Sequence, residues 1–281
     1  MLNHSEQLIR IPLLGEVTIK TLEKIGIKSL SDIASLNEKD CIIVANKLKF
    51  LSNRLAKNGY LRERLIMACR YAKAIKQNKP LFYGYNPLIN SLVSRYREGK
   101  LVFFDLEYDI MKSFIFIIGT MDIKGRITQF FIENIEEEKE ALRKLTNIIS
   151  NKLLVCYAGK SADIPILRKC YRKYCYSMPN FKLIDLFYDV LFTQNLKTQV
   201  IYLPLTYLDE KAIANYLGYK SPAYLKIKDG LHALLYFHRY IGGRNRKTKR
   251  EVKEQLLLYN RCDLERTKII LEKIFELLNV M

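Results

Sequence analysis

The sequence predicts an α/β fold with a mixed sheet flanked by helices, preceded by a small all-helical domain. Three observations predict it: apolar residues recur at helical spacing up to residue 79, β-rich runs begin at residue 101, and strand and helix patterns then alternate. We therefore expect a helical module at 1–79, a linker at 80–100 and an α/β domain at 101–281.

Within the helical module, Asn37 indicates a helix start, and Gly26 and Gly59 indicate helix ends. The apolar residues keep a helical period over 18–36, 37–57 and 61–75. Residues 80–100 then contain prolines, glycines and several tyrosines, and this change of pattern indicates the domain boundary.

The α/β domain starts with three β-rich runs, at 101–109, 113–122 and 126–134. Asp122 and Gly125 predict a tight turn between the last two runs. A short buried strand is expected at 152–158, with helices at 135–152, 163–175, 185–192, 209–218, 230–241 and 249–279. An antiparallel start followed by strand–helix alternation indicates a mixed sheet.

The chain has 47 lysine and arginine residues against 29 aspartate and glutamate residues, a net charge of +18 and a pI near 9.5. Charge of this size is informative about partners rather than about the fold, and phosphate backbones are the obvious counter-surface. The alternative explanation is an AT-rich genome, which favours lysine codons. We expect a nucleic acid as the partner.

Other classes of protein are disfavoured. No apolar run approaches the length of about 18 residues that a membrane span needs. The N-terminus lacks the layout of a signal peptide, so we expect an intracellular protein. The six cysteines lack CxxC spacing and predict free thiols rather than a disulfide framework or a zinc site. The sequence has three histidines and none is close in sequence to the acids described below, so we expect neither a histidine-based site nor a small-molecule cofactor.

Asp105 and Glu107 interrupt the apolar run of the first predicted strand. Residues two apart in a strand point to the same face, so the two carboxylates project together. An ionised side chain in apolar surroundings costs several kcal/mol unless something pairs with it. The pair therefore indicates a charged site, and a surface acid pair on an edge strand is the alternative.

Asp263 lies on the apolar stripe of the last predicted helix, one turn after Tyr259. A carboxylate on a buried stripe needs a partner. That partner is either a metal ion shared with other acids or a neighbouring arginine, Arg261 or Arg266.

Asp163 begins the helix that follows the fourth predicted strand, with Pro165 in its first turn. It can act as the N-cap of this helix, and it also faces the edge of the sheet where α/β sites form. Asp185 has a similar setting, and we interpret it as a cap. We expect Asp109 to be a solvated turn residue rather than a ligand.

These residue types fit phosphodiester hydrolysis. Two Mg²⁺ or Mn²⁺ ions about 3.5–4 Å apart can activate water and stabilise the leaving oxygen. Such ions prefer oxygen ligands, which carboxylates supply. A tyrosine hydroxyl can orient the water, whereas general-base action by tyrosine is disfavoured by its ordinary pKa near 10.

The order Asp-x-Glu on a strand, Asp before a helix and Tyr-x-x-x-Asp on a late helix resembles the DEDDy 3′–5′ exonucleases of the ribonuclease H-like superfamily. The segments LPLTYLDEKAIANYLGY and YNRCDLERT also resemble that family, over residues 101–281. The resemblance implies a ribonuclease H-like fold and hydrolysis from single-stranded DNA or RNA 3′ ends. It also implies that two metal ions bind Asp105, Glu107, Asp163 and Asp263, and that Tyr259 positions the water.

The N-terminal module resembles a helix-hairpin-helix unit with Gly15 at the hairpin, which would present backbone N–H groups to a phosphate. The alternative is an ordinary turn with Gly15 as a helix C-cap. A basic segment near the C-terminus, residues 241–251, is also a candidate for nucleic-acid binding. It is expected to form a mobile loop before the last helix. Its candidate nucleic-acid contacts are Arg244, Arg246, Lys247, Lys249 and Arg250, and a solvated charge run is the alternative.

Two other functions remain open at this stage. One is a structure-selective endonuclease or junction resolvase, which would cut closed circular substrates. The other is a catalytically silent nucleic-acid-binding protein of the same fold.

Overall fold

The computed structural model describes residues 8, 11–193 and 195–280. The first residues of the expected 1–79 module, 1–7, 9 and 10, lie outside the described residues. Backbone contacts divide the chain into two compact units. One comprises Met1–Pro87 with Val190–Ile213, and the other comprises Leu88–Asp189 with Ala214–Met281.

The first unit is mainly helical, as expected. Asn37 and Ser29 begin their helices with capping boxes, in which each cap and the acid three residues later exchange side-chain-to-backbone hydrogen bonds. Its elements include α2 Glu16–Lys24, α3 Leu30–Ser35, α4 Glu38–Leu51, α5 Asn53–Ala56, α6 Leu61–Gln77 and an antiparallel pair of β1 Leu81–Phe82 with β7 Ile201–Tyr202.

This organisation differs from the expected division in two places. The expected linker at 80–100 contains β1 and a helix, α7 Pro87–Arg97, whose apolar residues Ile89 and Leu92 are buried. Residues 190–213 belong to the first unit, where Gln199 is buried and its amide donates to the backbone carbonyls of Leu191 and Ile201. Local sequence patterns did not indicate that residues 190–213 pack with the N-terminal unit.

The second unit is built on a mixed sheet with the strand order β4-β3-β2-β5-β6. Its strands are β2 Leu101–Asp109, β3 Phe114–Asp122, β4 Ile127–Phe131, β5 Leu153–Cys156 and β6 Lys182–Asp185. The first three pair antiparallel, and β5 and β6 run parallel to β2. The predicted hairpin turn is confirmed, since Gly125 has φ +79° and donates its N–H to Asp122.

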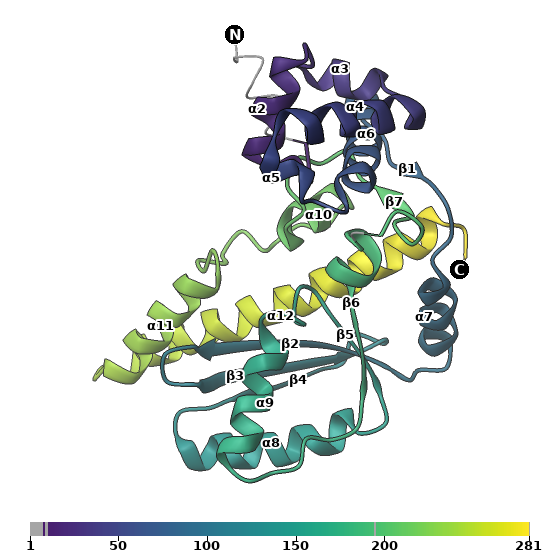
Figure 1. Cartoon of the computed structure of the whole chain (residues 1–281). Coiled ribbons are helices and arrows are strands. Elements are labelled where there is room, and N and C mark those ends of the chain that lie inside the picture. The colour runs from purple at the N-terminus through teal and green to yellow at the C-terminus, as the bar shows by residue number, and fades with distance from the viewer. Residues whose placement is uncertain (1–7, 9–10, 194, 281) are drawn as a thin grey trace. The chain divides into compact units, whose positions relative to one another are not determined.

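Helices cover both faces of this sheet, so the predicted fold class is confirmed (Figure 1). One face packs on α8 and α9, and the other on α11 and α12. The longest of these helices is α12, with 32 residues. The bounds of the helices after β4 are α8 Ile135–Ile149, α9 Asp163–Lys173, the π-helix η1 Leu186–Leu191, α10 Glu210–Tyr216, α11 Gly230–Gly242 and α12 Arg246–Leu277.

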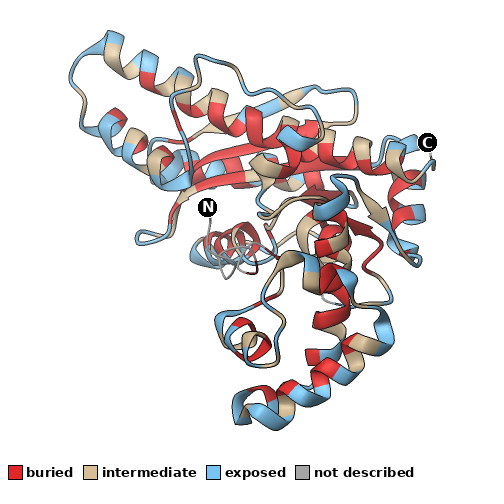
Figure 2. Cartoon of the chain, turned by 90° about the horizontal axis from the view of Figure 1, so that it is seen from above, coloured by how far each residue is buried: buried red, intermediate tan, exposed pale blue. Residues whose placement is uncertain are grey.

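Strand β2 is central in the sheet, so the edge-strand alternative for its acids is wrong. Its residues Val102, Phe104 and Leu106 are buried against α8 and α9. Because side chains alternate along a strand, Asp105 and Glu107 face the opposite side, where α12 lies. Strands β2, β3 and β5 are largely buried, whereas the helices have both buried and exposed residues (Figure 2).

Across the described residues, every helix is too short or too polar to cross a membrane.

Candidate metal centre

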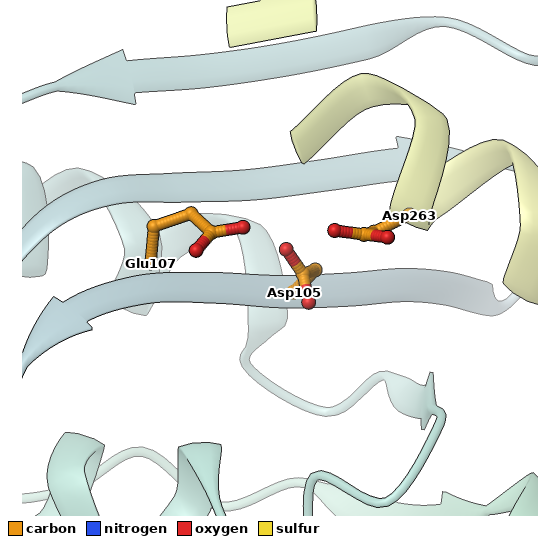
Figure 3. Close-up of side chains that lie close together, drawn as sticks. All are labelled: Asp105, Glu107 and Asp263. Atoms are coloured by element: carbon orange, nitrogen blue, oxygen red, sulfur yellow. The ribbon is translucent and has the colours of Figure 1, made fainter. Parts of the chain in front are cut away.

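The carboxylates of Asp105, Glu107 and Asp263 come together between the sheet and α12 (Figure 3). Each offers an oxygen, and these oxygens lie within 4.8 Å of one another. Strand alternation places the first two on one face of β2, and α12 supplies the third from more than 150 residues later in the sequence. Glu107 is 6% exposed and Asp263 is 7% exposed, so the cluster is largely removed from water.

This donor set suits a hard divalent cation. Three carboxylates in so small a volume repel one another, and burial increases the cost of their charge. A cation with a preference for oxygen ligands would offset both effects. The cluster could therefore bind a divalent metal ion.

Asp263 also has a cationic neighbour within the protein. The side chain of Arg266 is fully buried, forms an ion pair with Asp263 one turn earlier on α12 and lies 5.9 Å from the ring centre of Tyr219. Arg261, the other arginine considered from the sequence, is exposed. The predicted alternative of an arginine partner is thus observed for Arg266, in addition to the carboxylate cluster.

Asp163 stands at the start of α9 but is not its cap. The N-cap is Ala162, and Asp163 is the first helical residue, so the N-cap alternative is wrong. It is buried and lies outside the cluster of Asp105, Glu107 and Asp263 that the described residues form. Burial raises the pKa of Tyr108 to about 12, and the charges of Asp163, Glu107 and Asp105 contribute to this pKa shift. Asp163 is thus close enough to Tyr108 to act on the same hydroxyl as Asp105 and Glu107.

Asp185 has a larger role than the cap expected from the sequence. It does accept the N–H groups of Phe187 and Tyr188 at the start of η1, which confirms the cap. It also accepts those of Ala158 and Lys160 at 2.9 Å each, in the loop that leads to Asp163. Burial raises the pKa of this carboxyl, and the four N–H groups oppose that rise. Asp185 therefore fixes the backbone that positions Asp163.

Tyr259 lies one turn before Asp263 on α12 and is buried. It belongs to the apolar cluster in which Leu256 and Phe237 also pack, so its ring is held by α11 and α12. The helix thus presents both residues of the Tyr-x-x-x-Asp motif from consecutive turns.

Asp109 is buried, so the expectation of a solvated turn residue is wrong. It does shape the turn, because it accepts the N–H groups of Met111 and Lys112. It also lies 3.4 Å from Nε2 of His238 on α11, so a histidine is close in space to this acid although none is close in sequence. The two are far apart in sequence, and no local pattern connects them.

Asn260, which no sequence motif indicated, holds Asp105 in place. Asn260 is fully buried, and its Nδ2 donates to Oδ2 of Asp105 at 2.6 Å. Its Oδ1 accepts from Nε2 of Gln129 at 2.8 Å, and Gln129 also donates to the carbonyl of Leu257. A Cβ atom at Gly119 would lie 2.2 Å from Oδ1 of Asn260, so glycine is needed there for the close approach of α12.

A comparison with protein families matches residues 102–275 to a model of the RNase H superfamily. The chain belongs to the RNase H superfamily. The matched span covers nearly all of the sheet and α12, and includes all three residues of the carboxylate cluster. No curated protein and no solved structure matches the chain. Membership of the RNase H superfamily indicates nuclease activity on a nucleic-acid substrate.

In this RNase H-type site, Asn260→Ala is expected to lower hydrolysis by about 10–100-fold, the usual effect of removing a residue that orients a metal ligand. Asp105 would lose the donor that fixes its carboxylate. The measurement is the rate of oligonucleotide hydrolysis against Mn²⁺ concentration, with the half-maximal concentration expected to rise. Asn147→Ala, at an exposed position on α8, is the matched control. Equal Mn²⁺ dependence in wild type and Asn260→Ala would contradict the positioning role.

The basic segment 241–251 differs from the expected loop. Helix α12 already begins at Arg246, because the side chain of Asn245 accepts the N–H groups of Lys247 and Thr248. Arg244 lies in the short connection, whereas Lys249 and Arg250 belong to the helix. The basic side chains from Arg246 onward therefore lie in the first turns of α12.

Gly15 is the N-cap of α2, so the alternative of a helix C-cap is wrong. The next residue, Glu16, forms an exposed ion pair with Lys20 in the first turn. The amide end of α2 thus has a carboxylate beside it, which weakens its attraction for a phosphate.

Proposed function

We propose that the chain is a metal-dependent 3′–5′ exonuclease that hydrolyses phosphodiester bonds of DNA or RNA, with single-stranded 3′ ends as its substrate. The observation that carries this proposal is the convergence of Asp105, Glu107 and Asp263 within 4.8 Å in a domain of the RNase H superfamily. The DEDDy-type order of motifs along the sequence supports the exonuclease subtype.

Asp105, Glu107 and Asp263, with Asp163 from the start of α9, would hold two Mg²⁺ or Mn²⁺ ions. Bound ions of this kind supply Lewis-acid chemistry, which lowers the pKa of water and stabilises charge on the departing oxygen. The carboxylates set the charge and the oxygen donors of the site. Asn260 and Asp185 keep two of the proposed ligands oriented, through Asp105 and through the loop before Asp163.

Two tyrosines would act on the reacting groups as neutral hydroxyls. Tyr259 would orient the attacking water from the turn before Asp263. Tyr108, whose pKa is raised to about 12, stays protonated at neutral pH and is suited to donating a hydrogen bond rather than to acting as a base.

Nucleic-acid binding would use positive charge near the start of α12. Arg244, Arg246, Lys247 and Arg250 are exposed and Lys249 is partly exposed, so these side chains can approach a phosphate backbone. A helix-hairpin-helix contact at Gly15 is part of the same proposal, and Glu16 lies at the same helix end.

The test is a digestion series on two kinds of substrate, linear oligonucleotides labelled at the 5′ end and closed circular oligonucleotides. Each is incubated with and without Mn²⁺. We expect a ladder of products shortened from the 3′ end on linear DNA or RNA, intact circles, and no ladder without metal. The Asp263→Asn variant should give no ladder. Cleaved circles would instead indicate an endonuclease or junction resolvase. Failure to degrade any substrate would indicate a silent binding protein, and a ladder that persists in Asp263→Asn would contradict the metal-site assignment.

A further inference from the structure

Positive charge is unevenly distributed within the first unit. Residues 11–40 have a near balance, with four lysines against five acids. Residues 41–87 have a single acid, Glu63. Against it stand ten basic residues: Lys47, Lys49, Arg54, Lys57, Arg62, Arg64, Arg70, Lys73, Lys76 and Lys79. The net positive charge of the unit is therefore concentrated on the elements from α4 to α6. The segment that contains Gly15, residues 11–40, has no net positive charge.

A hollow of about 740 Å³ lies where α6 begins, next to the loop at 195–197. Both segments belong to the first unit. The hollow is lined by Tyr60, Arg62, Glu63, Arg64, Asn195, Leu196 and Lys197. Three cations thus surround a space large enough for a nucleotide.

The aromatic side chain at this hollow is available to a ligand. Tyr60 is 71% exposed, and although it occupies the N-cap position of α6 its side chain makes no capping bond. An exposed ring beside cations is the arrangement that stacks on bases of single-stranded nucleic acid, because every base has a π-face.

The hollow also has an unsatisfied acceptor. Oε2 of Glu63 is buried and has no hydrogen-bond partner among the described residues. Buried polar atoms are normally paired, so an atom of this kind calls for a donor. A base edge or a ribose hydroxyl would supply such a donor once the Glu63 side chain turns toward the hollow.

From these observations we infer that the hollow at Tyr60 binds a segment of single-stranded nucleic acid. Arg62, Arg64 and Lys197 contact its phosphates, and an unpaired base stacks on Tyr60. The inference rests on the proposed function, since the ligand is the substrate of the nuclease. It moves the main nucleic-acid contact of this unit away from Gly15, where Glu16 stands at the helix end.

The test is fluorescence anisotropy of a labelled single-stranded oligothymidylate with the full chain, in EDTA so that no strand is degraded. Tyr60→Ala is expected to weaken binding by about tenfold, the effect of losing one stacked base. The double variant Arg62→Ala/Arg64→Ala should weaken binding and reduce the slope of log K against log salt by about 1.4, the value for two phosphate contacts. Tyr60→Phe should retain the affinity of wild type.

The matched control is Lys24→Ala/Lys28→Ala, which removes two exposed cations from the same unit and should leave affinity near that of wild type. Wild-type affinity in Tyr60→Ala and in the double arginine variant would overturn the inference. Equal displacement of the oligothymidylate by polyglutamate would overturn its nucleic-acid specificity. Failure of the proposed function would show separately, as absence of hydrolysis by wild type with Mn²⁺, because the binding measurement needs no catalysis.

Discussion

Replacing Asp105 with asparagine is expected to lower kcat/KM for phosphodiester hydrolysis by about a thousandfold or more. Asp105 lies between Glu107 and Asp263 in the cluster (Figure 3). Asparagine keeps the shape of the side chain but removes a negative charge and one oxygen donor. Metal chemistry contributes several kcal/mol to such reactions, and each 1.36 kcal/mol corresponds to about a tenfold change in rate.

The measurement is single-turnover digestion of a 5′-labelled oligonucleotide at saturating Mn²⁺. Glu254→Gln is the control, because Glu254 is an exposed acid on α12 that pairs with Arg250 outside the cluster. The folded state of Asp105→Asn should be at least as stable as wild type in EDTA, since one of three mutually repelling charges is gone. A variant that retained activity within about tenfold of wild type would show that Asp105 is not a ligand.

Replacing Arg266 with methionine is expected to lower the free energy of unfolding by about 3–5 kcal/mol in EDTA. The guanidinium is fully buried and pairs with Asp263, so its removal leaves a carboxylate beside Glu107 and Asp105 without this cation. The loss should become smaller when Mn²⁺ is added, because bound cations would neutralise the same carboxylate.

Urea unfolding with and without Mn²⁺ measures this difference. Arg261→Met, at an exposed position of the same helix, is the control and should change stability by less than about 0.5 kcal/mol. An equal loss with and without Mn²⁺ would mean that Arg266 alone compensates the charge of Asp263. The cluster would then be a structural ion-pair network.

Much of the site was predictable because its motifs are local. Alternation along β2 sets Asp105 and Glu107 on one face, and helical spacing sets Tyr259 one turn before Asp263. The apolar runs on either side of these acids identified them as residues in need of a partner. The mixed sheet also followed from the order of strand and helix patterns.

The rest depends on contacts between distant parts of the chain. Asn260 and Gln129 are 131 positions apart, and their network with Asp105 exists only once α12 crosses the sheet beside Gly119. His238 likewise contacts Asp109 only because the fold brings α11 to the end of β2. Neither a hydrophobic periodicity nor a short sequence motif predicts contacts between residues so far apart in sequence.

One local error has a different cause. The basic run after Gly243 was expected to be a mobile loop because it follows a glycine pair. Repeated cations at a helix start also oppose the helix dipole, which is a cost to starting a helix here. The Asn245 cap outweighs that cost and starts α12 at Arg246.

The central claim is that Asp105, Glu107 and Asp263 bind the metal on which hydrolysis depends. The most direct measurement is a Mn²⁺ titration followed by electron paramagnetic resonance, in which protein-bound Mn²⁺ loses the signal of the free ion. We predict that wild type binds two Mn²⁺ ions and that Asp105→Asn and Asp263→Asn each lose most of this binding, while Glu254→Gln binds as wild type does. Wild-type Mn²⁺ binding in both aspartate variants would contradict the claim.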